Sequence, residues 1–552
     1  MSHGIEVRGT AADAVPAPVD MTGGQALVAA LAAHGVDTVF GIPGTHNLEI
    51  YRHLPAHGVR HVGTRHEQGA GYAADGYARS TGRVGVVVVT TGPALLNAAA
   101  AVGQAYSDSV PILVVSPGMP LRHPATGNGL LHETKDQQAA LAAVAAASLR
   151  ATSVAEIPVV VAQAFALMTG GRPRPVHLEI PLDVLEERGA VRVPAAALPA
   201  PAVTGPSALR AAADRLSCAR RPVILAGGGA NRAAAELRAV AERLHAPVVT
   251  TTNGKGVLPE DHPLSLGAGI HLPAVRELVE ASDVVLAVGT ELAGSDLWFG
   301  PLPLAGRLVR VDVDPVGMLT NALPDVALIG DAGRTLAALL PLLPEQSAVP
   351  SAGEVAAWRA RKAEEAQAEG AEWLPLVRAV AEALPRDAVV ATDNAMVCYY
   401  GMLANLPLHE PASYLFPTGY GTLGYALPAA IGARVAQPTR PVVAVLGDGG
   451  LMFTVAELAT AAELGLSLPV VVVDNSGYGE IRNEMVERGD PVHAVTFPAP
   501  DFAALGRVLG CLGVTLDGAA GLGHAISEAL AADLPTVLHV RHRRPAGEGH
   551  RP

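Results

Sequence analysis

Two polar residues near the end of the chain follow successive apolar runs, and their types suit a divalent metal ion. Asp448 comes after a predicted strand at 441–446, and Asn475 comes after a second one at 469–473, with a helix expected over 452–464. A right-handed crossover makes these two strands parallel. If they are neighbours, roughly 5 Å apart, both side chains stand at one sheet edge, where open α/β sheets bind ligands. A carboxylate and an amide oxygen suit Mg²⁺.

Three glycines around Asp448 add a feature that binds phosphate groups. Gly447, Gly449 and Gly450 let the backbone approach a phosphate closely, and the start of the following helix presents free N–H groups to it. An ordinary strand, turn and helix with a capping Asp would show the same glycines. Such a turn does not need Asn475 at the end of the second strand, so the combination favours a metal ion bound to a diphosphate.

The Gly-Asp-Gly run at Asp448, followed by Asn475, resembles the signature of the thiamine-diphosphate enzymes. The resemblance implies that Asp448, Asn475 and the backbone carbonyl of Gly477 hold Mg²⁺ on the diphosphate of the cofactor. Many members of the family carry two consecutive Asn residues, whereas this chain has Asp474 first. Asp474 precedes the ligand position, so the implied metal site is little affected.

A single acidic residue in the first part of the chain matches a second motif of this family. In RHEQGAGYAADGYARSTG, Glu67 stands at a strand-to-helix junction, where the helix dipole alone could explain an acid. The segment resembles the family's activating glutamate, which implies that Glu67 hydrogen-bonds the aminopyrimidine ring of the cofactor. Burial would raise the pKa of such a carboxyl toward neutrality. In the family this glutamate and the metal site come from different subunits, so the resemblance implies a homodimer or homotetramer with active sites at the subunit interface.

Two further positions resemble residues that shape the cofactor site. In GYGTLGYALPAAIGA, Leu423 stands where the family has a bulky apolar residue that holds the cofactor in a bent shape, although a core leucine would look the same. Asn394, in ATDNAMV, follows a predicted strand, and it is either a donor to the diphosphate or a plain turn residue. We count both among the expected cofactor-binding residues.

Residues that could move protons lie on two loops in the first part of the chain. GIPGTHNLEIY resembles the family's early substrate-side loop, which implies that Thr45 or His46 faces the reacting carbon. GLLHETKDQ places His132 where pyruvate-type decarboxylases carry a pair of histidines, and we expect His132 to relay protons. Histidine titrates near neutral pH, which suits this role, although a loop histidine with a structural hydrogen bond would show the same pattern.

The sequence just past the metal motif bears on the substrate. Several stretches, among them RHEQGAGYAADGYAR, GQAYSDSVPILVVS and NSGYGEIR, look more like 5-guanidino-2-oxopentanoate decarboxylase than acetolactate synthase. A guanidinium substrate needs a carboxylate partner, for which Glu480, beside Ile481, is our candidate; a solvated Glu at a helix start is the plainer interpretation. Acetolactate synthases carry a flavin-binding Arg-Phe-Asp-Asp-Arg run where this chain has GTELAGSDLW, so FAD is doubtful.

The elements that must position these residues follow an alternating strand and helix rhythm in three blocks. This rhythm predicts an α/β fold of three doubly wound domains, each with a mostly parallel sheet. The chain has 552 residues, half of them hydrophobic, and is long enough for several cores. We expect a disordered tail followed by a pyrimidine-binding, a middle and a diphosphate-binding domain, over residues 1–19, 20–188, 205–342 and 354–545.

The charge balance and the cysteines limit the partners and the compartment. Basic residues number 39 against 52 acidic ones, a net −13, and no basic run stands out, which argues against a nucleic-acid partner. We expect no membrane span, and the first residues lack the apolar core of a signal peptide. Three scattered cysteines, Cys218, Cys398 and Cys511, favour a reducing cytoplasm.

Domain order and length resemble the group of acetolactate synthase, benzoylformate decarboxylase and pyruvate oxidase. Besides a flavin oxidase, for which the flavin-binding run is missing, three functions fit the patterns. The first is decarboxylation of a small 2-oxo acid, with 5-guanidino-2-oxopentanoate as the leading substrate, using thiamine diphosphate and Mg²⁺. The second is a carboligase of the acetolactate synthase type that joins two 2-oxo acids. The third is a non-catalytic assembly protein with the same fold, against which the intact Glu67, Asp448 and Asn475 argue.

Overall fold

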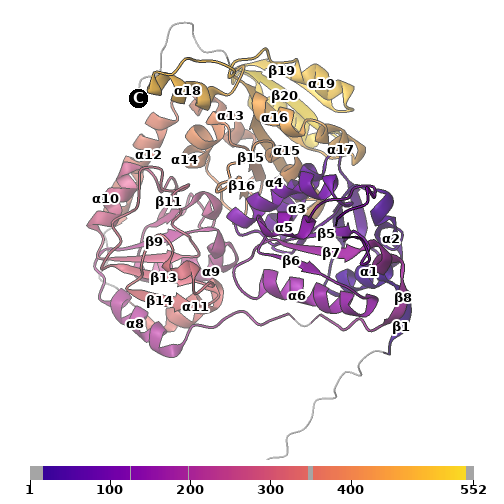
Figure 1. The fold of residues 1–552 in the computed structure, drawn as a ribbon. Helices are drawn as coiled ribbons and strands as arrows, with labels where there is room; N and C mark the ends of the chain where they lie inside the picture. Colours follow the sequence, from indigo (N-terminus) through magenta and orange to yellow (C-terminus); the bar gives the residue numbers. More distant parts are fainter. Residues whose placement is uncertain (1–16, 125, 197, 346–351, 543–552) are drawn as a thin grey trace, which may run out of the picture.

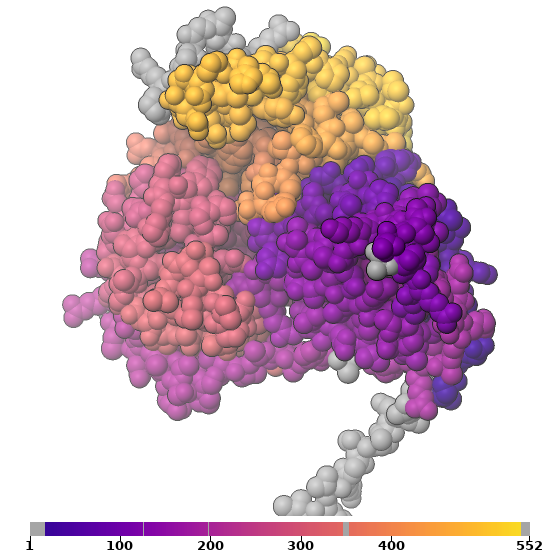
Figure 2. All heavy atoms as spheres, viewed as in Figure 1, coloured from indigo at the N-terminus to yellow at the C-terminus, as the bar shows by residue number. Residues whose placement is uncertain are grey.

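The computed structural model describes residues 17–124, 126–196, 198–345 and 352–542, and within them it contains three α/β units (Figure 1). Each unit is built on a parallel sheet of six strands, which confirms the expected fold class. Figure 2 shows the first and middle units side by side, with the third unit above them. Residues 1–16 of the expected tail, and the expected end of the third domain at 545, lie outside the described residues.

The first unit has the strand order β3-β2-β4-β5-β7-β6. Its strands are nearly continuous apolar runs because helices cover both faces of the sheet. One face packs against α1 (Gly23–Ala33) and α6 (Ile157–Thr169), and the other against α3 (Glu67–Thr81) and α4 (Pro93–Ser107). A separate antiparallel pair joins β1 to β8. The strands are β1 (Val19–Thr22), β2 (Thr38–Gly41), β3 (Arg60–Gly63), β4 (Gly85–Val88), β5 (Ile112–Gly118), β6 (Ala147–Arg150), β7 (Val176–Pro181) and β8 (Arg188–Val191).

The middle unit has the strand order β11-β10-β9-β12-β13-β14. Helices α8 (Pro206–Ser217), α9 (Ala234–Leu244) and α11 (Ala332–Leu339) cover one face, and α10 (Pro273–Ala281) and α12 (Ala352–Glu369) cover the other. Its strands are β9 (Pro222–Ala226), β10 (Val248–Thr250), β11 (Ser265–Ala268), β12 (Val284–Val288), β13 (Leu308–Asp312) and β14 (Val326–Ile329).

The third unit has the strand order β16-β15-β17-β18-β20-β19. One face packs on α15 (Ala426–Ala436), α17 (Glu457–Glu463) and α19 (Phe502–Val508), and the other on α13 (Leu374–Ala383) and α20 (Leu522–Ala531). None of the helices in the described ranges combines the length and the apolar character needed to cross a lipid bilayer. The strands are β15 (Val389–Thr392), β16 (Tyr414–Leu415), β17 (Val442–Gly447), β18 (Pro469–Asp474), β19 (Leu512–Asp517) and β20 (Thr536–Arg541).

Helices α3 and α15 join the first and third units in near backbone contact. A Cβ atom added at Gly432 would overlap the carbonyl oxygen of Ala73, and one added at Gly76 would overlap that of Ala429. Because both positions lack a side chain, the helices approach closely enough for one hydrophobic core to run between the two sheets. The edge of the first unit that carries Glu67 is therefore held firmly against the third unit.

The helix after the Gly-Asp-Gly run differs from the one expected over 452–464. Strand β17 passes directly into α16 (Asp448–Thr454), with Gly447 in an extended conformation as the N-cap residue. A second helix, α17, begins at Glu457. Asp448 is thus the first residue of a helix, where the helix dipole favours a negative charge, and the turn expected at Gly449 and Gly450 is helical instead.

Candidate functional site

Three polar groups converge at the carboxyl edge of the third sheet: the carboxylate of Asp448, the side-chain amide of Asn475 and the backbone carbonyl of Gly477. Strands β17 and β18 are parallel neighbours, with Gly447 opposite Val473. With its nitrogen turned toward them, the Asn475 amide donates hydrogen bonds to Asp448 Oδ1 at 3.2 Å and to the carbonyl oxygen of Gly477 at 2.8 Å. Turned the other way, the same amide would place a third oxygen beside these two, an arrangement that a bound cation would stabilise. Oxygens of these three kinds are ligands that fit Mg²⁺.

The carboxylate of Asp448 carries an electrostatic cost that a cation would remove. Its side chain is 1% exposed. Burial raises the pKa of Asp448 to about 6, and the nearby charge of Asp474 adds to the rise. The backbone N–H of Gly477 donates to Asp448 Oδ2 at 3.0 Å, so Oδ1 is the oxygen left facing Asn475. A bound cation would favour the ionised carboxylate at this position.

The loop that contains Leu423 is fixed by two neighbouring polar residues. The buried carboxylate of Asp393 accepts the backbone N–H groups of Gly424 and Asn394, each at 2.8 Å, and burial raises its pKa to about 6. The amide of Asn394 donates to the carbonyl of Thr422 at 2.9 Å and to a second loop carbonyl. Leu423 is half-buried at the tip of this loop. Asn394 therefore braces the loop, and its expected hydrogen bond to a diphosphate stays a prediction.

Gly449 and Gly450 lie against side chains, which leaves no room for a larger residue. A Cβ atom at Gly449 would come within 2.7 Å of the Tyr478 ring, and one at Gly450 within 3.2 Å of Asp393. Gly447 has looser surroundings, with Ala395 at 3.4 Å. Gly447 ends β17, and Gly449 and Gly450 lie in the first turn of α16; the role of the three glycines toward a phosphate stays a prediction.

Glu67 stands at the matching edge of the first sheet. It is the first residue of α3, it is half-buried, and its Oε2 accepts a hydrogen bond from Asn97 of α4 at 2.9 Å. Among the described residues, no hydrogen bond or ion pair joins Glu67 to Asp448 or Asn475. The two predicted centres thus lie on separate sheets of one chain.

The segment before Glu67 is held by Glu457 of the third unit, which the sequence reasoning missed. The buried carboxylate of Glu457 accepts the backbone N–H of Arg65 at 3.0 and 3.2 Å and that of His66 at 3.0 Å. The hydroxyl of Thr460 donates to it at 2.6 Å. Burial raises the pKa of Glu457. An acid in the apolar run AELATAAEL was the available signal, but its partners lie 391 and 392 residues away.

Two of the predicted proton-moving residues meet at one hydroxyl. His46 Nδ1 lies 2.6 Å from Thr91 Oγ1, which lies 3.4 Å from His132 Nδ1, and the two rings are 5.3 Å apart. Burial lowers the pKa of His46, and the neighbouring His132 lowers it further. His132 has a left-handed backbone, φ 62°. Thr45 is exposed at the start of a 3-10 turn, Thr45–Asn47, so His46 rather than Thr45 joins this cluster.

Glu480 and Ile481 lie at the start of α18 (Gly479–Arg488), just past the metal-binding loop. The hydroxyl of Tyr400 donates to Glu480 Oε1 at 2.7 Å. Ile481 is 45% exposed. Glu480 is therefore not the freely solvated helix-start acid of the plainer interpretation.

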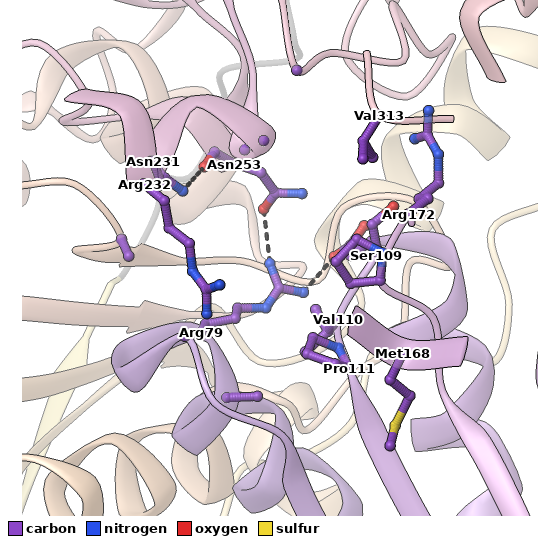
Figure 3. Close-up of a pocket in the computed structure, with 18 of the residues that line it drawn as sticks. Arg79, Ser109, Val110, Pro111, Met168, Arg172, Asn231, Arg232, Asn253 and Val313 are labelled. Carbon is purple, nitrogen blue, oxygen red and sulfur yellow. Dashed lines mark hydrogen bonds and ion pairs between the residues drawn. The ribbon is translucent and has the colours of Figure 1, made fainter. Parts of the chain in front are cut away.

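A large cavity lies where the three units meet (Figure 3). Its volume is about 1150 Å³. Arg79, in the last turn of α3, donates to Asn253 of the middle unit at 2.9 Å and to Asp108 at 2.8 Å. Asp108 in turn accepts the backbone N–H of Thr418 in the third unit at 3.0 Å. This network of charged hydrogen bonds ties the three units together beside the cavity.

Three family models match the chain in order. They are described as the N-terminal TPP binding domain, the central domain and the C-terminal TPP binding domain of thiamine pyrophosphate enzymes, and they match residues 21–141, 209–339 and 395–540. The first and third matches contain the edges that carry Glu67 and Asp448.

Curated relatives match over most of the chain. The "Probable 2-ketoarginine decarboxylase AruI" of Pseudomonas aeruginosa is 49% identical over 89% of each chain. The acetolactate synthase large subunit of Parasynechococcus marenigrum is 35% identical, over 96% of this chain and 88% of its own length. The acetolactate synthase isozyme 1 large subunit of Escherichia coli is 31% identical over 94% of each.

Proposed function

The chain belongs to the thiamine pyrophosphate enzyme family, and from this premise we propose that it decarboxylates a 2-oxo acid, 5-guanidino-2-oxopentanoate, also called 2-ketoarginine. The observation that carries the proposal is the meeting of Asp448, Asn475 and the carbonyl of Gly477 at one sheet edge, in a chain whose relative of 49% identity bears the name of such a decarboxylase. The proposed domains are those expected above, pyrimidine-binding, middle and diphosphate-binding.

The proposed metal is Mg²⁺, held by Asp448, Asn475 and the carbonyl of Gly477. Bound beside it through its diphosphate, thiamine diphosphate would supply a carbon nucleophile and an electron sink for the loss of CO₂. The backbone at Gly447, Gly449 and Gly450 would face the diphosphate. Leu423, on the loop braced by Asp393 and Asn394, would support the cofactor's bent shape.

Proton handling is proposed for the edge of the first unit. The carboxyl of Glu67 would hydrogen-bond the aminopyrimidine nitrogen, with Asn97 fixing its orientation. His46 and His132, linked through Thr91, would hold and move protons at the substrate. Because the pKa of His46 is lowered by burial, it stays neutral near pH 7 and can accept a proton.

Two copies of the chain are proposed to complete each site. Glu67 and the metal-binding oxygens lie on different sheets without a direct contact, and in a homodimer or homotetramer the Glu67 edge of one copy would face the Asp448 edge of another. This assignment follows the family resemblance of the two motifs. A cytoplasmic location is proposed on the three free cysteines, two of them buried.

The second candidate is a carboligase of the acetolactate synthase type. The relatives named acetolactate synthase, with 30–35% identity over 94–96% of the chain, favour it. Both activities begin with the same loss of CO₂ and differ in whether a proton or a second 2-oxo acid is added afterwards. Product analysis separates them: acetolactate from pyruvate supports ligation, and 4-guanidinobutanal from 5-guanidino-2-oxopentanoate supports decarboxylation.

The test is CO₂ release from a panel of 2-oxo acids by the full chain, supplied with thiamine diphosphate and Mg²⁺. We expect the highest kcat/KM with 5-guanidino-2-oxopentanoate, and a loss of release in Glu67→Gln with unchanged thermal stability. No release from any acid in the panel would overturn the proposal. Fast acetolactate formation from pyruvate, without 4-guanidinobutanal from the guanidino acid, would favour the second candidate function, the carboligase.

A further inference from the structure

A short π-helix beside the metal-binding oxygens carries two adjacent tyrosines, Tyr399 and Tyr400. The π-helical turn spans Val397–Met402. Just before it, the sulfur of Met396 lies 3.8 Å from the side-chain nitrogen of Asn475. π-helical turns are rare and are found frequently at functional sites. The turn therefore places both tyrosines in the immediate surroundings of the proposed reaction centre.

Aromatic rings from two units gather around Glu480. The Tyr400 hydroxyl donates to Glu480 Oε1 at 2.7 Å, and the rings of Tyr399 and Tyr400 are 4.7 Å apart. Trp298, from a loop of the middle unit, lies edge-on to Tyr400 at 6.0 Å and stacks on His271 at 3.9 Å. Trp298 is 37% exposed, so the cluster borders solvent on this side.

The carboxylate at the centre of this cluster has an unused acceptor. Glu480 Oε2 is buried and accepts no close hydrogen bond from the described residues; the Tyr399 hydroxyl lies near the same carboxylate, and burial and Glu480 together raise the pKa of Tyr399. A buried carboxylate oxygen without a hydrogen bond is costly and calls for a ligand or an explanation. Burial and the acids Glu480, Glu369 and Glu487 raise the pKa of Tyr400, and of these acids Glu369 already has a partner in His271 at 3.1 Å. The missing partner is thus a cation with N–H groups.

We propose that Glu480, Tyr399, Tyr400 and Trp298 receive the guanidinium end of the substrate and give the enzyme its preference for that group. Glu480 Oε2 accepts N–H groups of the guanidinium, and the aromatic rings hold the flat, delocalised cation by cation–π interactions. Tyr400 fixes the carboxylate through its hydrogen bond. The inference rests on the proposed function and adds which residues distinguish a guanidinium from a neutral side chain of the same shape.

The test compares two substrates of matched shape in the holoenzyme. One is 5-guanidino-2-oxopentanoate, and the other is 5-ureido-2-oxopentanoate, which is neutral. We expect Glu480→Gln to lower kcat/KM about 10- to 100-fold for the guanidino acid and less than about threefold for the ureido acid. Tyr400→Phe, which removes the hydrogen bond to Glu480, and Trp298→Leu, which removes an aromatic ring, should each lower kcat/KM for the guanidino acid about 3- to 30-fold. The losses should appear mainly in KM, because these residues hold the far end of the substrate.

Phe299→Leu is the matched control, because Phe299 adjoins Trp298 but is 70% exposed; it should leave both substrates unaffected. Equal losses on both acids in the Glu480, Tyr400 and Trp298 variants would mean that these residues only support the fold, and this would overturn the inference while the decarboxylase stands. If the wild-type enzyme decarboxylates other 2-oxo acids and not the guanidino acid, the proposed substrate fails instead, and the inference falls with it.

Discussion

The clearest test of how the fold prepares Glu67 is to remove the buried carboxylate of Glu457. In the wild-type chain, the backbone N–H groups of Arg65 and His66 donate to Glu457 at 3.0 to 3.2 Å. In Glu457→Ala, both N–H groups lose this acceptor. A hydrogen bond of this kind contributes about 0.5–1.5 kcal/mol net, because Arg65 and His66 are exposed residues whose N–H groups water can reach in the variant. The two N–H groups together give an expected loss of about 1–3 kcal/mol in the free energy of unfolding.

The same change should also reduce activity, because the freed segment leads directly into Glu67. A displaced catalytic group commonly costs up to about 100-fold in rate, so we expect kcat to fall about 10- to 100-fold with a smaller change in KM. Glu457→Gln keeps the volume and one acceptor oxygen, and it should fall between wild type and Glu457→Ala. Thermal melting and CO₂ release, both with cofactor and Mg²⁺ present, measure the two effects. A chain of three units need not unfold in two states, so melting temperatures are compared directly.

Glu463→Ala supplies the matched control on the same helix. Glu463 forms an ion pair with the side chain of the same Arg65, but its own side chain is 64% exposed. Exposed pairs contribute little, so both the melting temperature and kcat should stay close to wild type. If Glu457→Ala behaves like Glu463→Ala, the segment before Glu67 holds itself in place and the positioning role assigned to Glu457 is wrong.

Three further predictions concern the other parts of the site. Burial raises the pKa of Asp448 to about 6, so protons compete with the metal for this carboxylate below pH 6. The Mg²⁺ concentration for half-maximal activity should therefore rise as the pH falls below 6, approaching about tenfold per pH unit. Asp448→Asn should bind Mg²⁺ weakly and without this pH dependence. Thr91→Val removes the hydroxyl between the two histidines and should lower kcat about tenfold with little change in melting temperature; an unchanged pH profile of kcat would argue against a shared proton path. Gly432→Val forces α3 and α15 apart and should lower the melting temperature by several degrees, whereas Gly171→Ala, where an added Cβ meets no atom within 4 Å, should not.

The sequence was sufficient to predict the metal-binding edge because the two parallel strands that form it are consecutive in the chain. Asp448 and Asn475 follow strands that are consecutive in the chain and joined by a right-handed crossover, and the structure pairs those strands directly. The same rule placed Glu67 after a strand of another sheet. The helix start was placed four residues too late, because the glycines suggested a turn where the chain in fact enters the helix at Asp448.

Residues that act across the units could not be predicted in this way. Glu457 holds a segment near the other end of the chain, and an acid in a mostly apolar helix does not reveal its partner. Tyr399 and Tyr400 reach Glu480 through a π-helical turn, which the usual helical periodicity does not indicate. The meeting of His46 with His132 depends on Thr91, a residue with no signal of its own.

The near contact of α3 with α15 has a consequence for how this chain can be divided or recombined. One apolar core is shared by the sheets of the first and third units. Expressing either unit alone would therefore expose apolar surface and favour aggregation. The intervening unit keeps one core formed entirely from its own residues. Chimeras should therefore exchange the middle unit and take the first and third units from the same parent.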